Sequence, residues 1–160
     1  MDHVVDVDEL LFSYAERLRR TTTLQIGTSA ISGGQVRAAE MDVMRIIENL
    51  GSNAARHATS TVDLSVSEGE HWVEVAVTDD GPGVPEESRA AIFERFYRSD
   101  PDRSRADGGA GLGLAIVSEL TAKYGGTVHV EGAQPRGARF VVRLPASTPV
   151  GHEVALNSAI

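Results

Sequence analysis

Apolar residues recur along the chain at two spacings, one typical of helices and one typical of strands. Residues 7–20 place them three or four apart, which predicts a helix, and residues 42–57 do so along a longer stripe: Val43, Ile46, Ile47, Leu50 and Ala54. Apolar and polar residues alternate in 60–68 and 71–79, which predicts a hairpin, and in 126–132 and 138–145, which predicts a closing strand pair. Shorter strands are expected at 21–26 and 34–40, with a glycine-rich turn between them.

The remaining segments are turns, loops and one further helix. Residues 81–85 form a turn that opens a short helix at 86–93, and residues 97–109 are so polar and charged that we expect a mobile loop. A last helix should run from the glycines near 108 to about Tyr124. The elements predict an α+β domain over residues 1–146, with one mixed sheet carrying helices on one face, followed by a flexible tail at 147–160.

Composition excludes several classes of function. The net charge of −8 disfavours general nucleic-acid binding, and the absence of cysteine excludes disulfides and thiolate metal sites and favours a reducing compartment. No apolar run reaches the roughly 18 residues that a membrane-spanning helix needs, although a longer parent protein could be membrane-bound.

Four glycines crowd the entrance to the last helix, at positions 108, 109, 111 and 113. Glycine inside a helix costs roughly 1 kcal/mol against alanine, so it is usually retained for close backbone approach, often to an anion at the positive helix N-terminus. The segment matches neither the P-loop pattern nor the dinucleotide fingerprint, because no Lys-Ser/Thr pair follows and Leu114 occupies the last glycine position. A flexible hinge explains these glycines equally well.

Two further constellations carry polar groups. Asn49, Asn53 and His57 are spaced by four, so they share one face of the second helix, where an amide oxygen suits Mg²⁺; two hydrogen-bonded core asparagines would give the same pattern. Asp79 and Asp80 end a strand before Gly81-Pro82-Gly83, which is either a site for a flat ring beside a carboxylate or an ordinary turn.

A third constellation precedes the charged loop. Phe93, Phe96 and Tyr97 could anchor its start, and several arginines could reach phosphates, although a solvated loop with aromatic anchors is the plainer interpretation.

The order and spacing of these pieces resemble the catalytic, ATP-binding domain of sensor histidine kinases, within the GHKL ATPase superfamily. "ENLGSNAARHA" resembles the N box, "DDGPGVP" the G1 box, "IFERFY" the F box and "GGAGLGLAIV" the G2 box. The resemblance covers about residues 5–145 and implies the Bergerat fold, an α/β sandwich whose mixed sheet backs three helices, with ATP between the N-box helix and a mobile lid at 97–109.

The resemblance also implies roles for individual residues. Asp79 should accept a hydrogen bond from the adenine amino group, and Asn53 should coordinate the Mg²⁺ that bridges the phosphates, with Asn49 beside it. Asn49 and Arg98 are candidates for a direct part in catalysis. The remaining expected contacts to the nucleotide are Arg56, His57, Gly81, Gly83, Val84, Tyr97, Arg98, Gly109, Ala110, Gly111, Leu112, Gly113 and Leu114.

The chain departs from the wider pattern at three places. Hydrolytic members have a Glu four residues before the metal-binding Asn, where this chain has Asn49, and the neighbouring Glu48 points about 100° away around the helix. Ala138 follows Gly137 where the family often has Thr, so any hydroxyl contact there is lost. The family's phospho-acceptor histidine motif is absent.

The expected activity is therefore donation of the ATP γ-phosphoryl group to a histidine on a separate dimerisation/phospho-acceptor domain. A response regulator would act downstream, and the chain would lie in the cytoplasm as part of a membrane-anchored parent. The alternatives are a serine kinase of the anti-sigma-factor type and a module that senses ATP without transferring its phosphate.

Overall fold

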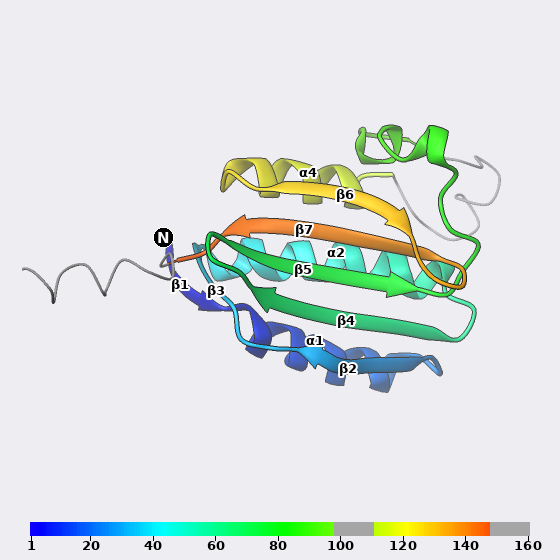
Figure 1. Cartoon of the computed structure of the whole chain (residues 1–160), viewed down its shortest axis with the longest axis horizontal. Coiled ribbons are helices and arrows are strands. Elements are labelled where there is room, and N and C mark those ends of the chain that lie inside the picture. Colours follow the sequence, from blue (N-terminus) through cyan, green and yellow to red (C-terminus); the bar gives the residue numbers. More distant parts are fainter. Residues whose placement is uncertain (98–110, 148–160) are drawn as a thin grey trace, which may run out of the picture.

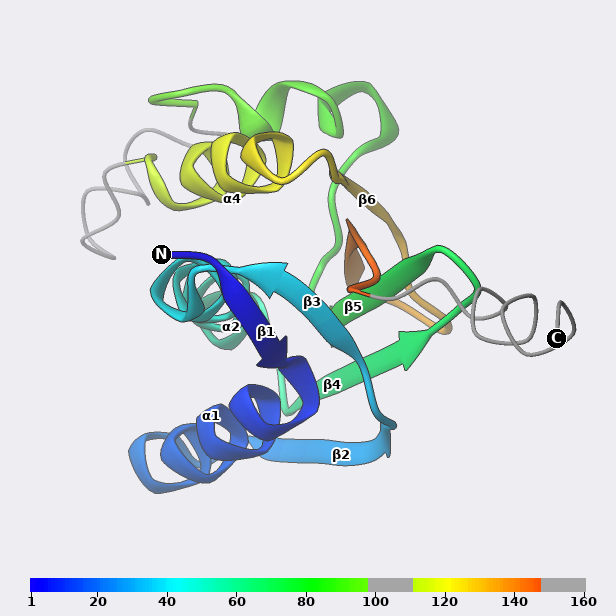
Figure 2. The same ribbon diagram turned by 90° about the vertical axis from the view of Figure 1, so that its left-hand side faces the viewer.

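The backbone is organised around a five-stranded sheet with the order β2-β4-β5-β7-β6, in a computed structural model that describes residues 1–97 and 111–147. Its strands are β2 (Gln25–Ile31), β4 (Thr61–Glu68), β5 (Trp72–Asp79), β6 (Thr127–Gly132) and β7 (Ala138–Pro145). The helices α1 (Val7–Thr21), α2 (Glu40–His57) and α4 (Gly113–Lys123) all lie on one side of the sheet (Figure 2). A second, two-stranded sheet pairs β1 (His3–Asp6) with β3 (Gln35–Ala38).

The alternating sequence pattern decides which face of the sheet is covered. Val62, Leu64 and Val66 of β4 are buried, whereas of the residues between them Asp63 is exposed and Ser65 is half-buried. Across the gap, the apolar stripe of α2 is buried too, and Leu50 is 0% exposed. The predicted fold class and both predicted hairpins are confirmed, since β4 pairs antiparallel with β5 and β6 with β7.

The mixed character of the sheet comes from β2, which pairs parallel with β4. Parallel neighbours need a long crossover connection. Here the chain leaves β2, forms β3 and α2, and returns to begin β4 (Figure 1). The helix that carries the N-box pattern is therefore also the connection that makes this pairing possible.

Several predicted boundaries were wrong. The expected strand at 21–26 instead begins with the end of α1: Thr21 is the last residue of the helix and Thr22 its C-cap, and both hydroxyls donate to the carbonyl of Leu18. Strand β2 starts only at Gln25. The expected short helix at 86–93 consists of two 3-10 turns, η1 (Glu86–Ser88) and η2 (Ala91–Phe93). The last helix begins at Gly113, and β1 was not predicted.

The residues after β7 are hydrogen-bonded to the two-stranded sheet. Ala146 forms an antiparallel bridge with Val36, and the Ser147 N–H donates to the Gln35 carbonyl at 2.8 Å. Residue 147, expected to begin a flexible tail, is therefore held, and residues 148–160 lie outside the described part. Within the described ranges, no helix has both the length and the apolar character needed to cross a bilayer.

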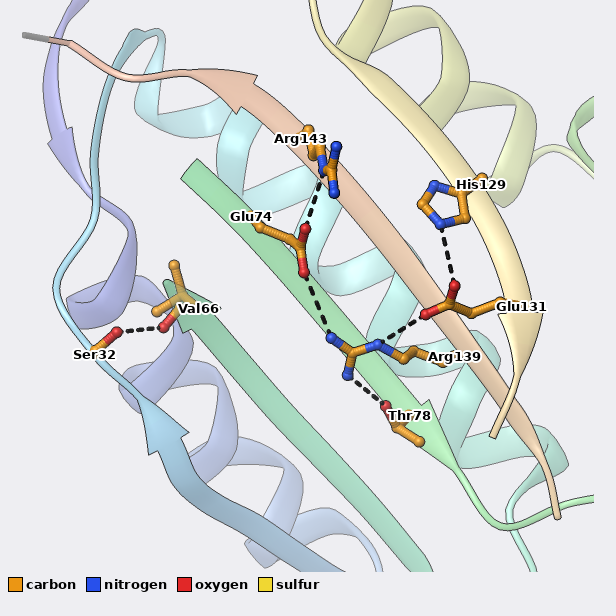
Figure 3. Close-up of polar contacts among 8 residues, drawn as sticks. All are labelled: Ser32, Val66, Glu74, Thr78, His129, Glu131, Arg139 and Arg143. Carbon is orange, nitrogen blue, oxygen red and sulfur yellow. Dashed lines mark hydrogen bonds and ion pairs between the residues drawn. The ribbon is translucent and has the colours of Figure 1, made fainter. Parts of the chain in front are cut away.

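The uncovered face of the sheet is polar and paired within itself (Figure 3). Glu74 of β5 lies between Arg139 and Arg143 of β7, at 3.5 and 3.0 Å, and Arg139 also meets Glu131 of β6 at 3.1 Å. A shallow hollow of about 550 Å³ lies beside this ladder. Because these charges are half-exposed and matched, they favour a solvated face and contribute little stability.

A glycine inside α2 fixes how closely α1 packs. A Cβ built on Gly51 would lie 2.2 Å from Cε1 of Tyr14, so the aromatic ring rests directly on the α2 backbone. Gly51 and Tyr14 are both buried. Glycine usually destabilises a helix interior, but at position 51 only a hydrogen atom fits between the α2 backbone and the ring of Tyr14.

We predict that Gly51→Ala destabilises the protein by about 1–3 kcal/mol, because overpacking outweighs the gain in helix propensity. Urea unfolding followed by circular dichroism measures the change. Gly33→Ala is the control, since no atom lies within 4 Å of its added Cβ, and it should change stability by less than about 1 kcal/mol. Equal effects of the two substitutions would contradict this account of the α1–α2 contact.

Candidate functional site

Three motifs that are distant in sequence meet at one end of α2. A Cβ on Gly81, just after β5, would lie 2.2 Å from the carbonyl oxygen of His57, the last residue of α2. A Cβ on Gly113, the first residue of α4, would lie 3.0 Å from Oδ1 of Asn49. The end of β5 and the start of α4 therefore both pack against α2, and both lie toward the same end of the molecule (Figure 1).

Asp79 is the buried carboxylate of this region, with 3% of its surface exposed. Its Oδ1 accepts a 2.8 Å hydrogen bond from the Gly81 N–H. Burial raises the pKa of Asp79, while hydrogen bonds from the Gly81 and Ala138 backbone and the nearby His57 partly oppose that rise. The Asp79 carboxylate is thus a buried acceptor that is held beside Gly81 by backbone donors.

Asp80 has a different role from its neighbour. Its carboxylate accepts from the backbone N–H groups of Thr59, Ser60 and Thr61 at 2.8–3.1 Å and from the Ser60 hydroxyl at 2.6 Å. These hydrogen bonds hold the pKa of Asp80 well below its usual range. Asp80 therefore joins the loop after α2 to the end of β5, and only Asp79 is left to face a ligand.

The turn between β6 and β7 supports the Asp79 loop from the other side. A Cβ on Gly137, whose φ is +113°, would lie 1.8 Å from the carbonyl oxygen of Asp79. Gly83, at φ +78°, packs on the carbonyl of Gly137 in turn, and Arg136 Nε donates to the Gly81 carbonyl at 3.1 Å. Ala138 has no hydroxyl to offer, but its backbone N–H donates a hydrogen bond to the Asp79 carboxylate.

The side chains of α2 divide between its neighbours. Asn49 Nδ2 donates to the Arg45 carbonyl at 2.8 Å, which leaves Oδ1 beside Gly113. Glu48 forms an ion pair with Arg17 of α1 and so faces away from α4. Asn53 is half-buried, and its amide makes no hydrogen bond within the described part of the chain. Arg56 and His57 are exposed at the helix end.

The described residues on either side of segment 98–110 are hydrogen-bonded to each other. The Phe96 N–H donates to the Gly111 carbonyl at 3.0 Å, and Gly111 has φ +73° with its Cα hydrogen directed at the Phe96 backbone. Arg95 pairs with Glu119 of α4 at 2.6 Å, which fastens the F-box segment to that helix. Arg98, Gly109, Ala110 and most of the expected lid at 97–109 lie outside the described residues.

The remaining candidates lie at the start of α4, after β5 and at the edge of the described chain. Leu112 is the N-cap residue of α4, and no side chain among the described residues caps the helix there. The backbone N–H groups of the first turn of α4 are therefore directed out of the helix end. Leu114 packs against the core, and Val84, half-buried, accepts from Arg89 Nε at 3.2 Å through its carbonyl. Tyr97 is half-buried at the edge of the described chain.

The donor set fits a magnesium ion that is shared with phosphates. Among the described residues no three His, Asp or Glu side chains gather as a metal cluster. Mg²⁺ in nucleotide sites usually takes only one or two protein oxygens and completes its coordination with phosphates and water. The amide oxygen of Asn53 can supply such a ligand.

Comparison with known proteins agrees with this geometry. Residues 38–148 match the family model described as "Histidine kinase-, DNA gyrase B-, and HSP90-like ATPase". The chain is 39% identical to the sensor histidine kinase RppB of Synechocystis over 130 residues, which are 78% of this chain and 29% of RppB.

Two solved structures extend the likeness to the fold. The mycobacterial sensor histidine kinase MprB superposes with a TM-score of 0.80 at 31% identity, covering 92% of this chain and 99% of that one. Full-length ShkA, solved in complex with AMPPNP, gives 0.79 at 34% identity and covers 92% of this chain and 31% of ShkA.

The chain belongs to this ATPase family, because the family model matches more than half of its residues. Domains of this family bind ATP. Within the family it corresponds to the ATP-binding catalytic domain of sensor histidine kinases. It spans less than a third of the length of RppB, so the activity of the whole protein is a matter for proposal.

Sequence reasoning missed two residues that build this site. Gly137 lies in a turn before a strand, and Asp80 has no role of its own in the site expected from the sequence. The glycine itself, placed before a strand, was the only available indication for the first. For the second, strand alternation puts neighbouring side chains on opposite sides, which separates the two aspartates.

We predict that Asp79→Asn stabilises the ligand-free protein at neutral pH. Because burial raises its pKa, the folded state binds this proton more tightly than the unfolded state does, so the ionised carboxylate costs stability as pH rises through and above the folded pKa. Denaturant unfolding of both proteins across pH measures the difference. The variant should gain on the wild type from about pH 4 upward, near the unfolded pKa of Asp, and equal stabilities at pH 7 would contradict the prediction.

Proposed function

We propose that the chain binds Mg-ATP between α2 and the expected lid at 97–109 and donates the γ-phosphoryl group to a histidine on a separate dimerisation/phospho-acceptor domain. A response regulator would then receive the phosphoryl group, and the work would be done in the cytoplasm by part of a membrane-anchored parent. The observation that carries the proposal is that the end of β5, which bears Asp79, and the first residue of α4 both pack against α2, the helix that bears Asn49 and Asn53. The sensor kinase names of RppB and MprB and the AMPPNP complex of ShkA support it.

The adenine base belongs beside Asp79. An ionised carboxylate can only accept hydrogen bonds, and the exocyclic amino group of adenine is a donor. Gly81 and Gly83 have no side chains to keep a flat ring away from the backbone. The interaction would satisfy a carboxylate whose burial is otherwise unfavourable.

The phosphates belong between α2 and α4. The backbone N–H groups of residues 111–114 would bind phosphate oxygens at the positive end of α4, with Arg56 and His57 near the chain of phosphates. Asn53 would hold the magnesium ion, which neutralises phosphate charge when it is bound. Arg98, Gly109 and Ala110 remain candidates on the expected lid.

Along α2, no carboxylate occupies the position of a hydrolytic base, which favours transfer to histidine over hydrolysis. Asn49 occupies the position of the hydrolytic base, and Glu48 is paired with Arg17 on the other side of α2. A neutral imidazole has its own lone pair, so it needs no base to attack phosphorus. Catalysis then consists of positioning the two reactants and stabilising charge.

The same geometry weighs against the two alternatives. A serine hydroxyl acceptor would need a base, which the arrangement of Asn49 and Glu48 does not provide. A module that only senses ATP is disfavoured because Asn53, Asp79 and the glycines before α4 are all present, so the site is not degenerate. Incubation of the chain with γ-labelled ATP and the matching phospho-acceptor domain separates them: label on histidine supports the proposal, whereas binding without transfer supports the sensing module.

We predict that Asn53→Ala removes most of the Mg²⁺-dependent part of ATP affinity, because it deletes the proposed metal ligand. Calorimetry with and without Mg²⁺ should show a large gain from the metal for wild type and a small one for the variant. Ser52→Ala, one position away on an exposed site, is the control and should behave as wild type. The same gain from Mg²⁺ in Asn53→Ala and wild type would exclude Asn53 as the ligand.

We predict that ATP is preferred over GTP by at least roughly tenfold, because guanine presents a carbonyl acceptor to the Asp79 carboxylate and an unpaired buried group costs about 1–3 kcal/mol. Asp79→Asn should weaken ATP binding and narrow or reverse the preference, since its amide can donate to that carbonyl. Competition binding measures both nucleotides. Unchanged discrimination in the variant would show that Asp79 does not read the base.

A further inference from the structure

The end of α4 that lies away from the proposed phosphate site is bonded to the beginning of α2. The Tyr124 hydroxyl, at the C-cap of α4, donates to the Asp42 carboxylate and accepts from the Ala39 N–H at 3.1 Å. Lys123 Nζ lies 2.8 Å from the same carboxylate. These contacts join residues more than 80 positions apart in sequence.

This arrangement completes a helix cap that α2 lacks on its own. Its N-cap is Ala39, which has no side-chain acceptor. In a capping box, an acidic side chain at the third helical position reaches back to the N–H of the N-cap residue. Asp42 occupies that position, and here the Tyr124 hydroxyl stands between the carboxylate and the Ala39 N–H and is bonded to both.

The polar contact is held firmly at both of its ends. The hydrogen bonds from Lys123 and Tyr124 lower the pKa of Asp42, so the carboxylate stays ionised as an acceptor. Burial and the Asp42 hydrogen bond raise the pKa of Tyr124, so its hydroxyl keeps the proton that it donates. Neither partner changes its charge near neutral pH.

The two helices are therefore joined at both ends of α4. Gly113 contacts Asn49 at the beginning of α4, and Tyr124 contacts Asp42 at its end. Asp42 and Asn49 are seven residues apart, which is about two turns or 10 Å along α2. Because α4 is short, the contact of Tyr124 with Asp42 prevents the whole helix from sliding along α2. Without that contact, a shift of α4 would move its first turn as well.

We propose that Tyr124 is a positioning residue for the phosphates: through Asp42 and Ala39 it sets where the first turn of α4 stands relative to Asn49 and Asn53. The inference rests on the proposed function, in which the backbone N–H groups of residues 111–114 donate hydrogen bonds to the phosphates. The adenine contact at Asp79 comes from β5 and is independent of this joint. Loss of the hydroxyl should therefore weaken the phosphate part of binding and leave the adenine part unchanged.

The test compares Mg-ATP with adenosine as ligands for Tyr124→Phe, which keeps the ring and deletes the hydroxyl. The Kd for Mg-ATP, measured by calorimetry, should rise about three- to tenfold, the equivalent of one hydrogen bond, while the Kd for adenosine stays within about twofold. Asp42→Ala should copy the variant. Asp42→Asn, which keeps an oxygen to accept from the hydroxyl, should retain most of the affinity for Mg-ATP.

Ile26→Val in β2 is the matched control for a general loss of stability. It removes one buried methyl group from a strand that bears none of the proposed site, and it should leave the ratio of the two affinities unchanged. Equal weakening of Mg-ATP and adenosine by Tyr124→Phe, or no weakening of either, would overturn the positioning role. A wild-type protein that binds Mg-ATP no better than adenosine would instead overturn the proposed phosphate site itself, and this inference with it.

Discussion

The close packing of backbone against backbone at the end of β5 is the constraint on which the site depends. Gly81 lies against the carbonyl of His57, and Gly137 against the carbonyl of Asp79, at distances that no Cβ could occupy. Through these two contacts the backbone at the end of β5 packs directly against the backbone of α2 on one side and of the β6–β7 turn on the other. The Asp79 carboxylate is thereby fixed in a nearly closed space next to the last turn of α2.

This packing creates an unfavourable charge that a ligand can relieve. Two backbone N–H groups offset part of the cost of burying Asp79, yet its pKa remains raised. The neighbouring Asp80 shows the opposite outcome, because four donor groups from three residues stabilise its charge and join it to the loop after α2. Two identical side chains in succession thus have opposite electrostatic environments, and only the poorly satisfied one is suited to recognise a donor.

Helix α2 connects the chemistry of the site to the rest of the fold. Successive side chains face different partners: Asp42 meets the end of α4, Glu48 meets Arg17 of α1, and Asn49 meets the start of α4. The residue that could act as a base is turned to α1, while the amides are turned to the proposed phosphates. The proposed transfer to histidine, rather than hydrolysis, would then follow from the direction in which Glu48 faces and from its ion pair with Arg17.

The sequence by itself determined the elements whose periodicity is local, together with the four motifs and their order. Hairpins, the stripes of α1 and α2, and the roles suggested for Asp79 and Asn53 followed from spacing and resemblance alone. Only the tertiary structure decided the pairing of β1 with β3, the parallel pairing of β2, the glycine under Tyr14 and the cap supplied by Tyr124. Each of these joins residues far apart in the chain, and a hydrogen bond or a steric limit between such residues leaves no periodic trace in the sequence.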